Sequence, residues 1–169
     1  MKYLISYFYH IRHFYPYMIP VSTALWDPKW YHNGMGQNHI FEDSRGVVNG
    51  LRCEKLHFPE ELYDNLHDKQ CKGKPCKYEP STCEFLKEYE KYLFSLNFKL
   101  IIDELEYFAK EMKDTLEFSE DPIIVLMVHE ANTNPCSERG PLIKLFKSNN
   151  IDIKEFEQTD FLKEKLILK

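Results

Sequence analysis

Ile123-Ile124-Val125-Leu126-Met127-Val128 is an unbroken six-residue apolar run, and Pro122 stands directly before it. Two isoleucines and two valines make the run rich in β-branched side chains, which pack well on a pleated surface. A strand with one face in solvent alternates polar and apolar residues, and this run does not alternate. It therefore predicts a strand buried on both faces, as the central strands of parallel sheets are.

The residues after this run predict a strand–loop–helix–strand unit. Residues 129–139 form a polar loop, and 151–156 alternate in a way that favours an outer strand. A right-handed crossover would return the intervening helix to the sheet. The apolar residues of that short helix are Leu142, Ile143, Leu145 and Phe146.

The residues before the run predict two more strands and two helices. Residues 1–7 and 18–23 are short segments rich in β-formers, whereas 46–58 fit a strand or a short helix equally well. Ser81-Thr82-Cys83-Glu84 matches a capping box, which predicts the start of a helix. Apolar residues then recur at helical spacing up to a break at Asn97, and a second amphipathic helix follows it to about residue 116.

The whole chain of 169 residues fits one domain, because typical domains have about 100–200 residues. We predict a single α/β domain over 1–169: a small Rossmann-like three-layer sandwich with a mostly parallel sheet. Residues 64–80 form a polar, cysteine-containing insertion, and 157–169 form a charged tail for which a last helix is one interpretation.

The net charge of −5 gives no broad electrostatic footprint for nucleic acid, so a nucleic-acid partner is not expected. The start of the chain has no signal-peptide pattern, and its apolar stretches fall far short of the roughly 20 residues of a membrane span. We therefore expect a cytoplasmic protein with reduced thiols and no membrane partner. The sequence leaves the oligomeric state open.

The polar residues that follow the three predicted strands point to one common site. Ligands of open α/β sheets bind beyond the carboxyl ends of the strands, which here are Tyr7, Thr23 and Val128. The inference requires the first two strands to run parallel to the third. The expected ligand-binding residues are Arg12, Ser22, Lys29, Trp30, His129, Ser137 and Arg139.

Cys136 and Glu130 are the candidate catalytic residues. A thiol at a helix N-terminus beside a guanidinium has a lowered pKa and is a better nucleophile. The alternative is that Cys136 packs as a small hydrophobe and Ser137 caps the helix. If the helix begins as late as Gly140, Cys136 lies in the loop and loses most of the dipole effect.

Arg139 together with backbone amides could hold a phosphate or a carboxylate. An ordinary ion pair between Arg139 and Glu130 or Glu138 is about as consistent with the sequence.

Zinc is the candidate cofactor, with Cys71, Cys76 and Cys83 as ligands and His67 as a fourth. Structural zinc sites use four nitrogen or sulfur ligands, usually as two short pairs. The spacings here are looser than such pairs, so unliganded thiols are the alternative. No dinucleotide-binding, P-loop, zinc-protease or nucleophile-elbow motif occurs in the chain.

Two blocks of the sequence resemble one known family. The first runs from Tyr3-Leu4-Ile5-Ser6-Tyr7-Phe8 to Arg12 and continues with Ile19-Pro20-Val21-Ser22 and Pro28-Lys29-Trp30. The second joins residues 123–130 to Pro135-Cys136-Ser137-Glu138-Arg139. Both are similar to signatures of the domain of unknown function 488 family, over about residues 1–156.

The cysteine insertion leading into Cys83-Glu84-Phe85-Leu86 is similar to a subgroup of that family found in low-GC bacteria and their phages. The resemblance implies the fold and the place of the site, and it implies no reaction. Members have Cys-His-Arg where this chain has residues 136–139, so Cys136 and Arg139 carry over. The histidine does not, unless His129 takes its place.

Three functions are compatible with these features. The favoured one is a binding or catalytic site for a small anionic molecule that resembles a nucleotide or a base, with Trp26 and Trp30 as stacking groups. A second is an enzyme that uses the Cys136 thiolate. The third is a non-enzymatic interaction protein, such as a phage-encoded modulator of a host protein. Its patch would be formed by exposed aromatics among Phe8, Tyr9, Phe14, Tyr15 and Tyr17.

Overall fold

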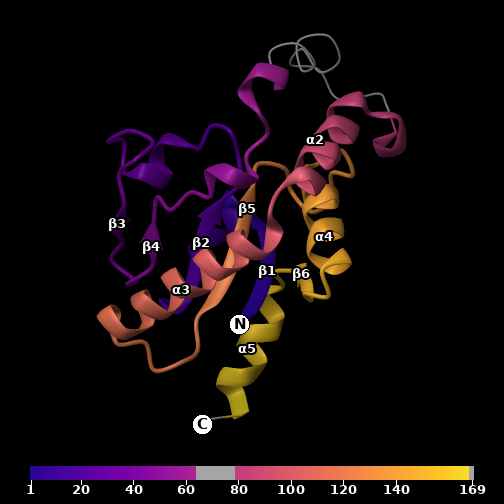
Figure 1. The fold of residues 1–169 in the computed structure, drawn as a ribbon. Helices are drawn as coiled ribbons and strands as arrows, with labels where there is room; N and C mark the ends of the chain where they lie inside the picture. Colours follow the sequence, from indigo (N-terminus) through magenta and orange to yellow (C-terminus); the bar gives the residue numbers. More distant parts are fainter. Residues whose placement is uncertain (64–78, 168–169) are drawn as a thin grey trace.

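The computed structural model describes residues 1–63 and 79–167. Its main sheet has four strands, all parallel, in the order β2-β5-β1-β6 (Figure 1). The apolar run is the central strand β5, paired on both sides and buried throughout, which confirms the prediction. The strands are β1 (Lys2–Tyr7), β2 (Met18–Ser22), β5 (Ile123–Val128) and β6 (Ile153–Glu155).

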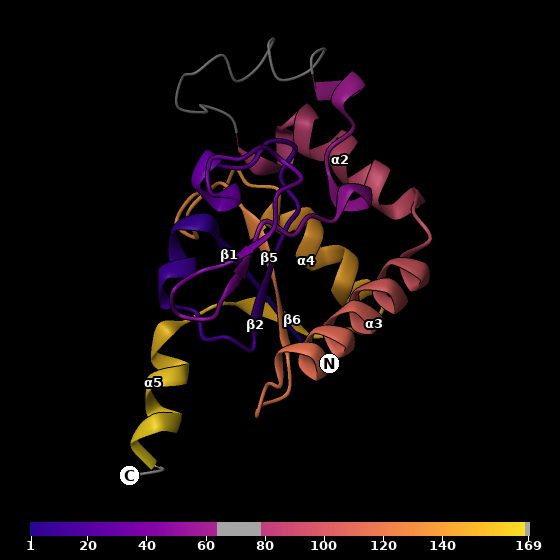
Figure 2. The same ribbon diagram turned by 90° about the vertical axis from the view of Figure 1, so that its left-hand side faces the viewer.

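Helices or helical turns cover both faces of the sheet, so the predicted α/β sandwich is confirmed (Figure 2). Alternate residues of β5 enter two different cores. Leu126 packs against α2, α3 and α4, whereas Met127 packs beneath the 3₁₀ helix η1 and α5. The helices are η1 (Phe8–His13), α2 (Glu84–Ser95), α3 (Phe98–Leu116), α4 (Arg139–Ser148) and α5 (Gln158–Ile167).

The two long helices lie where the periodicity places them, but the capping box is wrong. Helix α2 begins at Glu84 with Cys83 as its N-cap, and no side chain caps it. The reason is that Pro80–Thr82 forms a separate 3₁₀ turn, η4, in which the N–H of Cys83 donates to the Pro80 carbonyl. Asn97 does begin α3, because its Oδ1 accepts from the Leu100 N–H at 3.3 Å.

The remaining segments are short. Residues 46–58 contain both predicted kinds of structure: the strand β4 (Val48–Asn49), antiparallel to β3 (Phe41–Glu42), and the 3₁₀ helix η3 (Glu54–Leu56). The charged tail contains α5. Most of the predicted insertion, residues 64–78, lies outside the described residues.

The neighbouring strands β1 and β5 send the chain to opposite faces of the sheet. After β1 the chain enters η1, whose Phe8 and Ile11 pack in one core. After β5 it passes to α4, whose Leu142 and Leu145 pack in the other core. Such a reversal between adjacent parallel strands is a topological switch point, the place where open α/β sheets bind their ligands.

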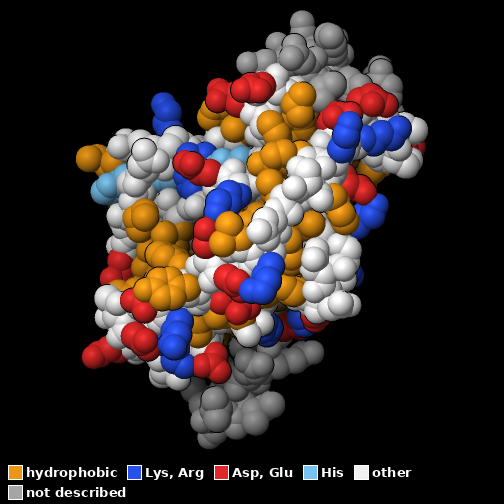
Figure 3. All heavy atoms as spheres, viewed as in Figure 1, with side chains coloured by type: hydrophobic (Ala, Val, Ile, Leu, Met, Phe, Trp, Pro, Cys, Tyr) orange, Lys and Arg blue, Asp and Glu red, His pale blue; other side chains and the backbone are white. Residues whose placement is uncertain are grey.

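On the face shown in Figure 3, lysine and arginine side chains alternate with acidic ones, and no broad field of one sign appears. None of the helices in the described part of the chain has the length and apolar character needed to cross a bilayer.

Candidate functional site

The carboxyl ends of β1, β2 and β5 meet at one edge, because all three strands are parallel. This confirms the premise of the site prediction. Side chains in the segments that follow these strands connect the three segments to one another. His129, directly after β5, bonds through Nε2 to the Trp26 carbonyl in the loop after β2. Its ring also lies 5.2 Å from that of Phe8, directly after β1.

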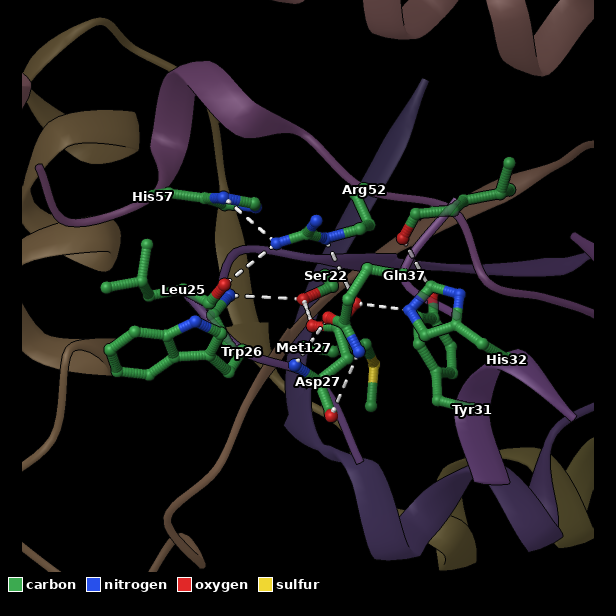
Figure 4. A network of polar contacts seen from close by, with 12 residues as sticks. Ser22, Leu25, Trp26, Asp27, Tyr31, His32, Gln37, Arg52, His57 and Met127 are labelled. Atoms are coloured by element: carbon green, nitrogen blue, oxygen red, sulfur yellow. Dashed lines mark hydrogen bonds and ion pairs between the residues drawn. The ribbon is translucent and has the colours of Figure 1, made fainter. Parts of the chain in front are cut away.

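A buried ionic cluster, here called the Asp27 node, lies beneath the loop that follows β2. It consists of Ser22, Asp27, His32 and Arg52 (Figure 4). The Asp27 carboxylate is wholly buried; its Oδ1 accepts from the Ser22 hydroxyl. Its other oxygen, Oδ2, lies 2.7 Å from Nε2 of His32 and 3.1 Å from Nε of Arg52.

The two ring nitrogens of His32 each face an oxygen atom. Nε2 faces the Asp27 carboxylate, and Nδ1 lies 2.8 Å from the His39 carbonyl oxygen. The His39 carbonyl can approach the backbone here because residue 50 is a glycine. A Cβ at Gly50 would lie 2.1 Å from that carbonyl oxygen.

The loop above this node presents both tryptophans at the edge. Trp26 is 47% exposed and Trp30 is 49% exposed. Trp26 contacts the Tyr63 ring at 4.8 Å, and Trp30 meets Phe8 edge-on at 6.4 Å. Tyr31, directly after Trp30, is buried. Its hydroxyl group contacts the backbone carbonyl of Pro20 in β2 and that of Leu51 in the neighbouring segment. Burial raises the pKa of Tyr31 well above its usual range, so this anchor stays protonated.

His57 extends the Asp27 node on the other side of Arg52. One guanidinium nitrogen, Nη2, donates to the Leu25 carbonyl at 2.8 Å and lies 3.4 Å from Nδ1 of His57. Burial, followed by the positive charge of Arg52, lowers the pKa of His57 to about 4. The ring is therefore neutral near pH 7, and its buried Nε2 has no hydrogen-bond partner among the described residues.

Arg139 fastens the loop between β5 and α4 to the edge strand. Its guanidinium donates to the carbonyls of Glu130 at 2.9 Å and Ala131 at 3.2 Å, and it forms an ion pair with Glu155 of β6. The partner is thus Glu155, which corrects the expected pair with Glu130 or Glu138. Arg139 is only 7% exposed, and its donors already face acceptors of this chain. Its geometry is that of a residue that positions the loop.

Two carboxyl groups lie side by side in the same loop. Burial, together with the neighbouring Glu130 carboxylate, raises the pKa of Glu138 to about 8. Glu130 accepts from the Ser137 hydroxyl at 3.2 Å, and that hydroxyl in turn accepts from the Arg139 N–H. Near neutral pH Glu138 therefore keeps its proton, which suits a general acid.

Cys136 is partly exposed and lies in the loop ahead of α4, which begins at Arg139. Its N–H donates to Oδ1 of Asn134 at 2.9 Å. Because the helix starts three residues later, the thiol gains little from the helix dipole. The position of Cys136 therefore favours a nucleophilic role less than a position at the helix N-terminus would.

His10 is close enough to two of the predicted cationic residues for their charges to act on it. Burial and the positive charges nearby, including Arg12 and Arg139, lower the pKa of His10. Arg12 and Arg139 therefore lie at the same edge. Arg12 is exposed, with its guanidinium 3.9 Å from the centre of the Tyr9 ring.

The predicted ligand-binding residues differ in their access to a ligand. Arg12, Lys29, Trp30 and His129 are exposed, whereas Ser22, Ser137 and Arg139 are buried and bonded within the chain. The sequence prediction missed five residues that organise the edge: Asp27, His32, Arg52, Glu138 and Glu155. The sequence did contain a signal for Glu155. Strand alternation places it on the same face as the buried Ile153, so its side chain was expected to point toward the interior.

The predicted aromatic interaction patch is wrong as a continuous surface. Phe8 and Phe14 are each 3% exposed and belong to a core, because η1 turns them toward the sheet. Tyr9 is exposed, while Tyr15 and Tyr17 are half-buried near the opposite end of the sheet.

The zinc hypothesis stays a prediction. Cys71, Cys76 and His67 lie outside the described residues, and Cys83 is buried in the core with α2. Within residues 1–63 and 79–167, no three His, Cys, Asp or Glu side chains group to hold a metal.

Comparison with known proteins gave no match to a family model, to a curated protein or to a solved structure. The resemblance to the domain of unknown function 488 family therefore also stays a prediction.

Proposed function

We propose that this chain binds a small anionic molecule with a planar, base-like group at the carboxyl edge of its sheet. The observation that carries the proposal is the switch point between β1 and β5. Adjacent parallel strands whose chains leave toward opposite faces open a crevice, and open α/β sheets bind their ligands there.

The charge of the edge favours an anion. The exposed Arg12 and Lys29 lie on the 3₁₀ helices after β1 and β2. Arg139 contributes by holding the Glu130 and Ala131 carbonyls, which orients the loop around the crevice.

The aromatic side chains favour a planar group. Trp26 and Trp30 are each about half exposed on a loop that the Asp27 node holds in place. Large rings held at low entropic cost are effective stacking surfaces for bases.

A second candidate is acid–base catalysis on the bound molecule. It is supported by Glu138, whose pKa is raised to about 8 beside the Glu130 carboxylate. Such a pair can donate a proton from Glu138 and accept one at Glu130. Loss of turnover with retained ligand binding in Glu138→Gln is the expected signature.

Tryptophan fluorescence tests the binding proposal directly, because the chain has only two tryptophans and both lie at this edge. The protein is titrated with nucleoside monophosphates, the matching nucleosides and inorganic phosphate. We expect a monophosphate to change the emission and to bind more tightly than its nucleoside.

Lys29→Ala should weaken that binding about five-fold, the effect of roughly 1 kcal/mol for one partly solvated charge contact. Lys110→Ala, which removes an exposed lysine on α3, is the matched control and should bind as the parent does. No change of emission with any of these probes up to millimolar concentration would overturn the proposal.

A further inference from the structure

A cavity of about 600 Å³ opens at the amino-terminal end of the sheet, away from the Asp27 node. Its walls come from the segment before β2, the turn between α3 and β5, the β3–β4 hairpin and α5. Figure 2 shows the α3–β5 turn and α5 at this same end of the molecule. The volume lies within the range of about 300–1,000 Å³ that small-molecule sites occupy.

One wall of this cavity is aromatic. Tyr15 and Tyr17 stack with ring centres 5.8 Å apart and planes within 11° of each other. They flank Pro16, and Phe118 and Phe161 complete the lining.

A glycine brings the hairpin against this wall. Gly46 has φ +82°, a left-handed conformation that glycine adopts without strain. A Cβ at Gly46 would lie 3.3 Å from Cγ of Pro16 and 3.5 Å from Oε1 of Glu42. The Glu42 carboxylate therefore lies beside the proline between the two tyrosines.

The charged residues of the described lining are all acidic, and Lys2 lies beside it, with Nζ 5.0 Å from the centre of the Phe161 ring. The described lining contains Glu42, Glu117 and Glu120, and none of these described residues is Lys, Arg or His. Glu117 is the C-cap of α3 with φ 53°, a position where glycine is usual. Ser119 donates its hydroxyl to the Glu120 carboxylate and so orients it.

We propose that this cavity binds a small organic cation with an alkylated ammonium group. Aromatic faces attract cations through the ring quadrupole, and alkyl groups around the nitrogen pack against apolar walls. The three carboxylates supply the opposite charge. A hydrated ammonium ion is less suited, because it would lose water to the tyrosine and phenylalanine rings without filling the space.

The test is isothermal titration calorimetry of the full chain with choline, with tetramethylammonium and with 3,3-dimethylbutan-1-ol, the neutral isostere of choline. Both cations should bind, and the neutral isostere should bind at least about ten-fold more weakly. Amide NMR spectra should place the choline-induced shifts at Gly46, Tyr17 and Phe118.

Variants separate the aromatic and the charged contributions. Tyr17→Leu should weaken choline binding about five-fold or more, whereas Tyr17→Phe keeps the ring and should bind nearly as the parent does. Glu117→Gln and Glu120→Gln should each weaken it about two- to five-fold. Tyr107→Leu and Glu111→Gln, at exposed positions on α3, are the controls and should change nothing.

Equal binding of choline and its neutral isostere would overturn the proposal. So would amide shifts confined to other parts of the chain, or no detectable binding of either cation at about 50 mM. Because the probes are cations and the cavity is at the amino end, these outcomes are independent of the anion site.

Discussion

His32 Nε2 lies 2.7 Å from Oδ2 of Asp27, and neither side chain is more than 1% exposed. Arg52 contacts the same carboxylate oxygen at 3.1 Å. The loop that bears Trp26 and Trp30 is thus attached to the sheet by a buried ionic contact, in addition to the Tyr31 anchor. The stacking surface at the edge depends on this attachment.

Asp27→Asn should destabilise the protein by about 3 kcal/mol or more, because the largely buried Arg52 guanidinium then faces a neutral amide. Urea unfolding at pH 7 measures the change. Asp103→Asn is the control, since its pair with Lys99 is exposed and should contribute less than about 1 kcal/mol. Equal effects of the two substitutions would contradict a buried ionic role for Asp27.

The pairing of Asp27 with Arg52 could not be predicted from sequence. The two residues are 25 positions apart, and their contact exists because residue 52 runs beside the end of β2, where Ser22 and Arg52 form a parallel bridge. No local periodicity marks such a contact. The Asp27–His32 pair had only a weak signal, since both are polar residues in a segment rich in aromatic side chains.

His57 predicts a loss of stability in acid. Its pKa is about 4 in the folded chain, below the ordinary 6.5, so the unfolded chain binds a proton first as the pH falls. The lowered pKa of His57 therefore makes the free energy of unfolding depend on pH. This contribution is fully present above about pH 6.5 and is lost by about pH 4, a total change of about 3 kcal/mol.

A histidine-selective NMR titration checks the pKa itself, and urea unfolding of His57→Gln from pH 7 to pH 4 checks the linkage. The free-energy gap between parent and variant should shrink as the pH falls. A His57 pKa near 6.5 in the folded protein would contradict the burial described above.

Glu138 predicts the opposite trend in base. Its pKa is raised from 4.5 to about 8, so the folded chain keeps a proton that the unfolded chain releases. Stability therefore falls as the pH rises from about 4.5 to 8, and it is level above that range.

Glu138→Gln should remove this fall. In urea unfolding, the free energy of unfolding of the variant should therefore rise relative to that of the parent between pH 5 and pH 9. Glu111→Gln, at an exposed position on α3, is the control. Parallel stability curves for the parent and Glu138→Gln would show that the carboxyl ionises normally.

Arg139 and Glu155 should act as one unit. Arg139→Lys removes the planar fork that reaches two carbonyls and a carboxylate, and Glu155→Gln removes the charge that faces it. If Arg139 positions the loop, both variants should weaken nucleotide binding to a similar degree in the fluorescence titration. A large loss in Arg139→Lys with none in Glu155→Gln would instead make Arg139 a direct ligand contact.

The fold was largely predictable because β5 is distinctive. Its six apolar residues identify a central strand. The segments at residues 1–7 and 151–156, which form strands in the same sheet, can be recognised as strands from their local sequence patterns. The start of α2 at Glu84, rather than after a capping box at Ser81, was not predictable in this way. Pro80 directs that stretch into a 3₁₀ turn, which competes with the capping box for the same backbone groups.

The location of the site was more predictable than its chemistry. Parallel strands bring their carboxyl ends together, so residues after Tyr7, Ser22 and Val128 had to meet. Which of them stay exposed depends on tertiary packing. Arg139 was expected to face a ligand, and it faces Glu155 because β6 lies next to β1 at the same edge.

The most direct measurement of the binding site is an amide NMR map of the full chain titrated with a nucleoside monophosphate. Binding in the β1–β5 crevice should shift residues 8–10 and 129–138 most, with smaller changes around Gly46 and Phe118 at the other end of the sheet. Shifts centred on that other end, or an unchanged spectrum at millimolar ligand, would contradict an anion site at the carboxyl edge.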